Sequence, residues 1–249
     1  MITFPFSLSG KKILVTGASS GIGQSTAIEC SRMGAKLIIS ARSEVRLNET
    51  FSQLTGDGHQ IVVADLSRQE GIDAVMTAID KVDGIVLCAG KGLTLPYQFA
   101  TREKFDDIFD INFFSPVELL RLLYKKKKIN TAGSVVVIAS LGGTKIFSGG
   151  NSIYGASKAA LNCIMKFCAK EFSSRKIRVN CICPGMVETP LIHRGTVSDE
   201  QLKENEKLYP LGRYGKPEEI AYSAVYLLSD ATTWMTGQDI ILDGGISIR

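Results

Sequence analysis

Residues 12 to 23 read K-I-L-V-T-G-A-S-S-G-I-G, an apolar run followed by a turn that carries three glycines. The run predicts a strand buried on both faces, and the residues from 21 onward predict a helix. Glycines in such a turn allow a tight reversal and close packing of the helix, while the exposed amides at the helix start bind a pyrophosphate. The stretch therefore predicts a dinucleotide site, with Gly17, Ser19, Ser20, Gly21, Ile22 and Gly23 as its candidate residues.

Two other kinds of site share parts of this pattern. Residues 17 to 21 also read G-x-S-x-G, with Ser19 as the candidate nucleophile of a hydrolase. A hydrolase needs a histidine base, but the chain has only His59 and His193, and hydrolases place the nucleophile later in the order of strands. A phosphate-transferring loop needs Gly-Lys-Ser/Thr after the turn, which the sequence lacks. Both patterns fit less well than a dinucleotide turn.

Short apolar runs alternate with longer stretches of helical period along the whole chain. This alternation predicts an α/β fold: a single Rossmann domain over residues 1–249, with a doubly wound, seven-stranded parallel sheet and helices on both faces. Residues 186–214 contain no strand candidate and one short helix after Ser198, which predicts a substrate lid. We expect strands at 12–16, 36–40, 60–64, 84–88, 134–139, 177–182 and 239–243, and helices near 21–33, 43–54, 68–80, 101–128, 152–173 and 217–229.

The composition is typical of a globular protein. Of the 249 residues 45% are hydrophobic and 22% charged, and the net charge is a modest +4. The lysine run at 125–128 falls at the end of an expected helix, where cations complement the helix dipole. With no secretory leader and no membrane-length apolar stretch, we expect a cytoplasmic protein without nucleic-acid or membrane partners. Six cysteines without CxxC pairing, and two histidines, predict reduced thiols and no metal site.

The residues that end the second and third expected strands bear on the choice of cofactor. An acidic residue after the second strand binds the adenosine ribose diol and repels a 2′-phosphate, whereas this chain has Arg42 there. That favours NADP(H), with NAD(H) as the alternative, although an arginine also fits a strand end in solvent. Asp65, just past the third strand, is a candidate partner of the adenine amino group or a cap of the next helix.

Residues 151 to 160 read N-S-I-Y-G-A-S-K-A-A, which places Tyr154 one helical turn before Lys158. Together with the glycine turn and the alternating fold, this pattern resembles the classical short-chain dehydrogenase/reductase family over essentially the whole chain. Pro184-Gly185, P-L-G-R-Y-G-K-P-E-E-I-A from 210 and T-G-Q-D-I-I-L-D-G-G from 236 resemble the branch of 3-oxoacyl-[acyl-carrier-protein] reductases, carbonyl reductases and alcohol dehydrogenases. The resemblance implies an oxidoreductase that interconverts a carbonyl and a secondary alcohol by hydride transfer.

The resemblance also implies a role for each of four catalytic residues. Tyr154 is the acid–base group: a free tyrosine has a pKa near ~10, and the Lys158 ammonium and a positive nicotinamide ring are expected to lower it. Lys158 is also implied to hold the nicotinamide ribose. Ser140, after the fifth strand, is expected to stabilise charge on the carbonyl oxygen, or else to cap a turn. Asn112 matches the helix residue where a disturbed helical bond lets water bridge to the lysine, and local backbone bonding is the alternative.

The family pattern extends to further contacts and has one departure. Residues 88–90 read Cys-Ala-Gly where the family usually has Asn-Ala-Gly, so Cys88 is interpreted as a structural thiol and the segment is expected to be held less firmly. After the sixth strand, Val187 and Thr189 are implied to contact the carboxamide end of the cofactor. The other expected cofactor contacts are Leu66, Ala89, Gly90, Pro184 and Gly185, and the expected substrate pocket is Leu93, Thr94, Ile146, Phe147, Leu191, Ile192, His193 and Arg194.

The resulting hypothesis is an NADP(H)-dependent carbonyl reductase or alcohol dehydrogenase acting on a small molecule. A non-catalytic NAD(P)-sensing regulator of the same fold is disfavoured because Ser140, Tyr154 and Lys158 are all present. A sugar epimerase or dehydratase usually has a larger carboxyl-terminal domain. Acyl carriers, small keto compounds, sugars and steroids remain open as substrates. Because family members pair the helices at 101–128 and 152–173 and pack their final strands together, the resemblance implies a homodimer or homotetramer.

Overall fold

A seven-stranded parallel sheet forms the centre of the molecule. The computed structural model describes residues 4–194 and 198–248. All neighbouring strands are parallel, in the order β3-β2-β1-β4-β5-β6-β7. The order changes direction between β1 and β4, and doubly wound sheets bind ligands beside the carboxyl ends of strands at such a point. The strands are β1 (Lys12–Thr16), β2 (Lys36–Ala41), β3 (Gln60–Val63), β4 (Val82–Leu87), β5 (Ile129–Ile138), β6 (Arg178–Pro184) and β7 (Asp239–Leu242).

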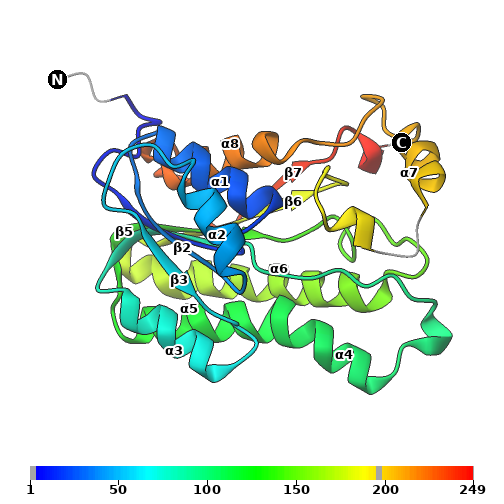
Figure 1. Cartoon of the computed structure of the whole chain (residues 1–249), viewed down its shortest axis with the longest axis horizontal. Coiled ribbons are helices and arrows are strands. Elements are labelled where there is room, and N and C mark those ends of the chain that lie inside the picture. The colour runs from blue at the N-terminus through cyan, green and yellow to red at the C-terminus, as the bar shows by residue number, and fades with distance from the viewer. Residues whose placement is uncertain (1–3, 195–197, 249) are drawn as a thin grey trace.

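Helices cover both faces of this sheet (Figure 1). One face carries α1 (Gly21–Arg32), α2 (Glu44–Phe51) and α8 (Pro217–Leu228). The other carries α3 (Gln69–Ala78), α5 (Ser115–Lys125) and α6 (Ser152–Phe172), with α4 (Arg102–Phe109) beyond the amino end of α5. Short 3₁₀ turns span Tyr97–Phe99, Ser173–Arg175, Ile192–Arg194, Asp230–Thr232 and Ile246–Ile248. The fold is the predicted doubly wound α/β sheet.

Burial on both faces of the sheet explains the continuous apolar runs in the sequence. Ile13 and Val15 of β1 pack into the core beneath α1 and α8, while Leu14 between them packs into the core on the α3, α5 and α6 face. All three side chains are fully buried. Side chains of a strand alternate between faces, so a strand covered on both sides has no face directed to solvent and is mostly apolar. The end of β1, where the glycine turn begins, is therefore fixed from both sides.

The structure differs from the predicted elements at the start of β5 and in the long helix before it. Val82 pairs with Ile129 and Gly84 pairs with Ser134, so the residues between Ile129 and Ser134 bulge out of register. This irregular, partly polar stretch lacks the apolar pattern that marks the rest of the strand. The helix expected at 101–128 is α4, a π-helical segment over Asp110–Phe114, and α5. A π-segment is a common feature of helices at functional sites.

Residues 186–214 form a segment with no strand, as predicted, in the parts that the structure describes. Its helix α7 (Asp199–Glu206) has Ser198 as its N-cap residue, which forms a capping box with Gln201. The two ends of the segment are joined, because the Glu188 N–H donates to the Gly215 carbonyl (2.9 Å) and the Gly215 N–H donates to the Met186 carbonyl (3.0 Å). No helix within 4–194 and 198–248 has both the length and the apolar character that crossing a bilayer requires.

Candidate active site

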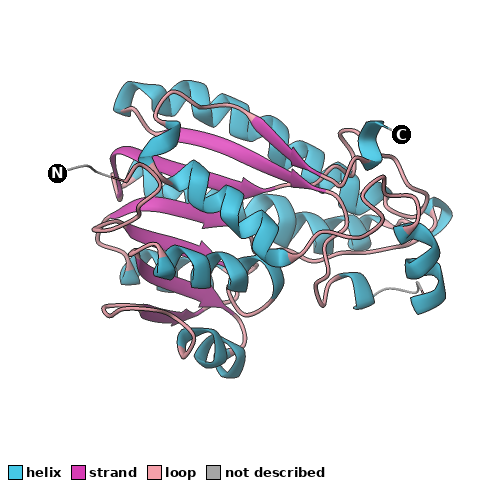
Figure 2. Cartoon of the chain, turned by 90° about the horizontal axis from the view of Figure 1, so that it is seen from above, coloured by secondary structure: helices cyan, strands magenta, loops and turns pink. Residues whose placement is uncertain are grey.

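A large cavity of about 2270 Å³ opens at the carboxyl ends of the strands. Figure 2 shows the strand arrows pointing toward the loops and short helices at this edge. The predicted residues that line the cavity come from loops far apart in the sequence. They are Gly17, Ser19, Ser20, Gly21, Ile22, Arg42, Asp65, Leu66, Ala89, Gly90, Leu93, Thr94, Ser140, Ile146, Phe147, Tyr154, Lys158, Pro184, Gly185, Val187, Thr189, Leu191 and Ile192.

Three predicted residues do not line the cavity. Gly23 lies behind the glycine turn, and Asn112 is fully buried beneath the cavity wall. His193 belongs to a short 3₁₀ turn and is exposed, with its Nδ1 3.8 Å from a carboxylate oxygen of Asp199. The structure therefore does not bring His193 into the pocket, because the turn directs Leu191 and Ile192 to the cavity instead. The side chain of Arg194 lies outside the described residues.

At each of the three glycines of the β1–α1 turn, a side chain would collide with a different neighbour. A methyl group on Gly17 would lie 2.9 Å from the Ala89 Cα, and one on Gly23 would lie 2.3 Å from the Gly17 carbonyl oxygen. One on Gly21 would lie 2.9 Å from the Thr189 side chain, so the turn also meets the segment after β6. The N-cap Ser20 makes no side-chain capping bond, and no acidic residue lies in the first turn of α1. The free amides at this helix start suit the anionic pyrophosphate of a dinucleotide.

Three arginines gather at the edge of the cavity beyond β2 and β3. Arg42 follows β2, and the exposed Arg46 and Arg68 also line the cavity there, although the sequence analysis missed both. The Ser67 hydroxyl donates to Asp65 (2.7 Å), which lowers the pKa of that carboxyl, and the charges of Arg42 and Arg68 lower it further. The sequence did hold a signal for these two arginines, because each stands a few residues after the end of a strand, at the edge where the cofactor is expected.

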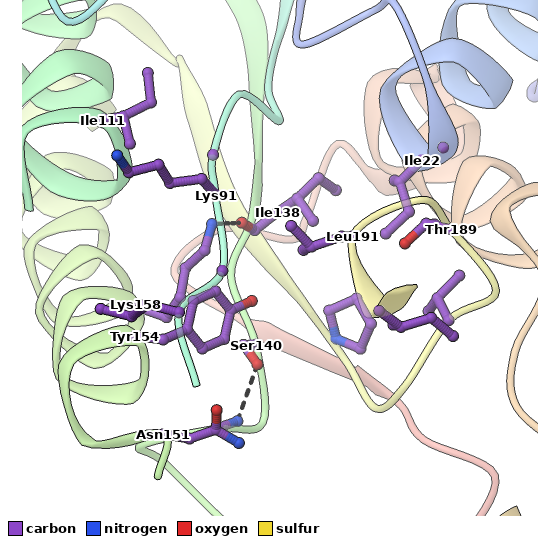
Figure 3. A pocket seen from close by; sticks show the side chains of 18 of the residues that line it. Ile22, Lys91, Ile111, Ile138, Ser140, Asn151, Tyr154, Lys158, Thr189 and Leu191 are labelled. Carbon is purple, nitrogen blue, oxygen red and sulfur yellow. Dashed lines mark hydrogen bonds between the residues drawn. The ribbon is translucent and has the colours of Figure 1, made fainter. Parts of the chain in front are cut away.

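Ser140 and Tyr154 meet in the cavity (Figure 3). The Gly142 N–H donates to Ser140 Oγ at 3.0 Å, which leaves the Ser140 hydroxyl hydrogen free to donate. A methyl group on Gly142 would lie 3.3 Å from Ser140 Oγ and 3.8 Å from Tyr154 Cε1, so both side chains border the same glycine. Burial raises the pKa of the Tyr154 phenol, and the hydrogen bond with Ser140 lowers it in part.

Lys158 lies beside Tyr154 on the same side of the cavity, and its Nζ donates to the Ile138 carbonyl at 2.9 Å (Figure 3). Burial lowers the pKa of this ammonium. The prediction that Lys158 lowers the pKa of the phenol is therefore not met by the protein's own groups, because desolvation dominates for both residues. A positive charge brought by a ligand is what could reverse the direction for Tyr154.

Asn112 lies in the π-segment and holds the loop that follows β4. Its Oδ1 accepts from the Lys91 N–H (2.9 Å), and its Nδ2 donates to the Lys91 carbonyl (3.0 Å) and to Ser157 Oγ (3.1 Å). A methyl group on Gly90 would lie 3.0 Å from Asn112 Oδ1 and 3.5 Å from Lys158 Nζ. The side chain of Asn112 is thus engaged with Lys91 of the loop and with Ser157 of α6.

The loop at 88–91 is held from two sides in spite of the family departure at Cys88. Thr16 Oγ1 accepts from the N–H groups of Cys88 (3.1 Å) and Ala89 (3.3 Å), while Asn112 holds Lys91. The loop therefore keeps these hydrogen bonds without the asparagine that the family usually has, and a less firm hold than in the family stays a prediction. Burial raises the pKa of the Cys88 thiol to about 11, with Lys158 acting weakly in the opposite direction. A thiol with so high a pKa is a weak nucleophile.

The comparisons with known proteins agree with this geometry. A family model described as enoyl-(acyl carrier protein) reductase matches residues 17–247. A tropinone reductase homologue of Arabidopsis thaliana is 33% identical over 98% of this chain and 92% of its own length. The chain belongs to the short-chain dehydrogenase/reductase family. Short-chain dehydrogenase/reductases transfer hydride between NAD(P) and a CH–OH or carbonyl group, so this chain is an oxidoreductase.

Two further short-chain dehydrogenase/reductase relatives cover the whole length. A 3-oxoacyl-[acyl-carrier-protein] reductase of Rickettsia bellii is 33% identical over 96% of this chain and 98% of its own. The structure of an angucycline C-6 ketoreductase with bound NADP superposes with a TM-score of 0.89, at 25% identity, over 98% of each chain. Among the described residues, no group of three His, Cys, Asp or Glu side chains could hold a metal ion.

Proposed function

We propose that the chain is an NADP(H)-dependent ketone reductase in which Tyr154 is the proton donor. The observation that carries this proposal is the Ser140–Tyr154 pair, which lies in one cavity with the uncapped start of α1 and the buried Lys158. Ser140 Oγ accepts from the Gly142 N–H, so the Ser140 hydroxyl can turn its hydrogen from Tyr154 to a carbonyl oxygen. A bound NADPH supplies the hydride.

The proton path follows from the positions of the protein's own groups. Tyr154 gives its proton to the carbonyl oxygen as that oxygen gains charge, and Ser140 stabilises the same charge by a hydrogen bond. Lys158 lies behind Tyr154, one helical turn along α6, and orients the sugar next to the nicotinamide. Asn112, in the π-segment, opens a route by which the proton is replaced from solvent.

The test is the oxidation of NADPH by a panel of ketones, followed by absorbance, with NADH in parallel. We expect turnover of at least one neutral ketone, with NADPH preferred. If cofactor bound but no carbonyl in a broad panel, and no alcohol with NADP⁺, was turned over, a cofactor-sensing protein would be the better description. The names of the relatives, tropinone reductase homologues and a 3-oxoacyl-[acyl-carrier-protein] reductase, define the first ketones and acyl esters to include.

Preference for NADP(H) is expected to depend on Arg42. Arg42, Arg46 and Arg68 form a positive edge that suits a 2′-phosphate, and hydrogen bonds between charged groups contribute roughly 1.5–3 kcal/mol. Replacing Arg42 by Asp should lower the NADPH-over-NADH ratio of kcat/KM by about 10- to 100-fold. Arg32→Asp, the same change on the exposed end of α1, is the matched control. An unchanged ratio in Arg42→Asp would contradict the assignment.

The pH dependence of the reaction should report the raised pKa of Tyr154. Ketone reduction needs the phenol protonated, and burial raises its pKa above the ordinary value. The kcat/KM for reduction should therefore stay level through neutral pH and fall only in alkali. Alcohol oxidation needs the phenolate, which the positive ring of NADP⁺ stabilises, so its kcat/KM should rise with pH and reach its plateau at lower pH than the fall in reduction. A reduction rate that increased toward alkaline pH would contradict Tyr154 as the acid.

The subunit arrangement is proposed from the family resemblance and from exposed apolar side chains. Family members pair the two long helices, which here are α4–α5 and α6, and large apolar side chains on these helices are exposed, Phe114 at 54% and Phe167 at 63%. We infer a homodimer or homotetramer formed through this surface. Sedimentation of the protein at micromolar concentration tests this, and a monomer would contradict it.

A further inference from the structure

Asn151 stands at the N-cap position of α6, but its side chain does not cap the helix. It is the N-cap of the helix that carries Tyr154 and Lys158, yet its side chain makes no capping hydrogen bond. An N-cap asparagine ordinarily accepts a bond from an N–H of the first turn, which stabilises the helix. Here the side chain is half-buried and lines the cavity, near Ser140 and Tyr154 (Figure 3). A polar side chain placed this way is available to a ligand.

Thr94 lies beside Asn151 and completes a polar pair. Thr94 Oγ1 is 3.5 Å from Asn151 Oδ1. The loop of Thr94 is tied to the start of α6, because the Leu95 N–H donates to the Gly150 carbonyl at 2.7 Å. In the part of the chain that the structure describes, the Asn151 amide nitrogen has no hydrogen-bond partner. The backbone bond from Leu95 to Gly150 thus holds the pair in place, and the N–H groups of the Asn151 side chain are free to donate.

The surroundings decide what this pair can recognise. Apolar side chains that line the same cavity include Leu93, Ile146 and Leu191. The charged side chains that line the cavity in the described residues make no hydrogen bond to Asn151; they are Arg42, Arg46, Asp65, Arg68, Lys91, Asp107, Asp110 and Lys158. A carboxylate would be costly in such a wall, whereas an uncharged carbonyl or hydroxyl oxygen matches an amide and a hydroxyl.

The spacing along α6 sets the distance from the reacting carbonyl. Asn151 and Tyr154 are three residues apart, and side chains at that spacing are neighbours on a helix, with Cβ atoms about 5–6 Å apart. A carbonyl oxygen bonded to Tyr154 would therefore have the second oxygen only a few bonds away. β-Keto esters, β-keto thioesters and β-hydroxy ketones have oxygens at this separation.

We propose that Asn151, together with Thr94, binds a second, uncharged oxygen in the β-position of the substrate, and so selects β-oxygenated ketones over simple ones. The proposal rests on the proposed function, because it takes Tyr154 to be the group at the reacting carbonyl. Asn151 is a specificity residue in this view, and Thr94 positions it.

The test compares ethyl acetoacetate with 2-heptanone, which has the same chain length but no second oxygen. In Asn151→Leu, kcat/KM for ethyl acetoacetate with NADPH should fall about tenfold, as for loss of one neutral hydrogen bond, while 2-heptanone stays within about twofold. Thr94→Val should give a smaller loss, and the double variant should lose less than the sum of the two. Asn48→Leu, the same change on the exposed side of α2, is the matched control. Equal losses for both ketones, or no loss, would overturn the proposal.

A binding measurement separates this proposal from the proposed function. In Tyr154→Phe loaded with NADPH, calorimetry should show ethyl acetoacetate binding more tightly than 2-heptanone, and adding Asn151→Leu should remove the difference. If the preference for ethyl acetoacetate is lost only when Asn151 is replaced, the proposal is supported, even if kinetic measurements assign the proton donor to a residue other than Tyr154. Equal binding of the two ketones with Asn151 in place overturns it, whatever the activity of the enzyme.

Discussion

Replacement of Tyr154 by phenylalanine is expected to lower kcat for ketone reduction by about 10²- to 10⁴-fold, the usual contribution of a general acid. The change removes one oxygen atom and keeps the ring, so the wall of the cavity remains. Lys158 keeps its bond to the Ile138 carbonyl, and the glycine turn is untouched. NADPH affinity should therefore stay within about threefold of the wild-type value, because the missing hydroxyl contributes at most about one neutral hydrogen bond.

The measurements are single-turnover rates with a saturating ketone and NADPH titration by fluorescence. Tyr222→Phe makes the same change on the exposed surface of α8, away from the cavity, and should behave as wild type. A Tyr154→Phe enzyme that kept most of its rate would remove the acid from the mechanism. Equal loss of rate and of cofactor affinity would instead mean that the phenol supports the binding site.

The strands could be predicted because they are buried on both faces, so that their sequences are nearly continuous apolar runs. The start of β5 could not, since the residues between Ile129 and Ser134 bulge away from β4 and carry no apolar pattern. The irregular bonding of the Asp110–Phe114 segment is likewise set by packing against α6 and the loop after β4, where Asn112 bonds Lys91 and Ser157. Such tertiary bonds leave no local signal.

The residues of the candidate site also divide into those that the sequence predicts and those that only the fold brings to the cavity. The chemistry of Ser140, Tyr154 and Lys158 was visible because family motifs place these residue types in a fixed order. Arg46 and Arg68 escaped notice because one lies in the first turn of α2 and the other at the N-cap of α3, and the fold brings both to the cavity that Arg42 lines. His193 was expected in the pocket, but the direction of a side chain in a 3₁₀ turn does not follow from its neighbours. Asn151 has an N-cap sequence, and its departure from the cap is set by the loop of Thr94.

The second large effect is expected for Gly23→Ala. The added methyl carbon would lie 2.3 Å from the carbonyl oxygen and 2.7 Å from the carbonyl carbon of Gly17, within the backbone of the same turn. Backbone cannot rotate away as a side chain does, so α1 must move off the end of β1. Overpacking of this kind costs roughly 1–3 kcal/mol, which for a domain of this size lowers Tm by about 2–12 °C.

Movement of α1 should also reduce the affinity for NADPH. The amides of the helix start bind the pyrophosphate only if they converge on it, and loss of that geometry should weaken binding at least about tenfold. Gly149→Ala is the matched control, since a methyl group there would meet nothing within 4 Å. NADPH titration and thermal unfolding of both variants check the prediction. Wild-type affinity in Gly23→Ala would show that the pyrophosphate does not depend on this turn, and the dinucleotide site would then have to be sought elsewhere in the cavity.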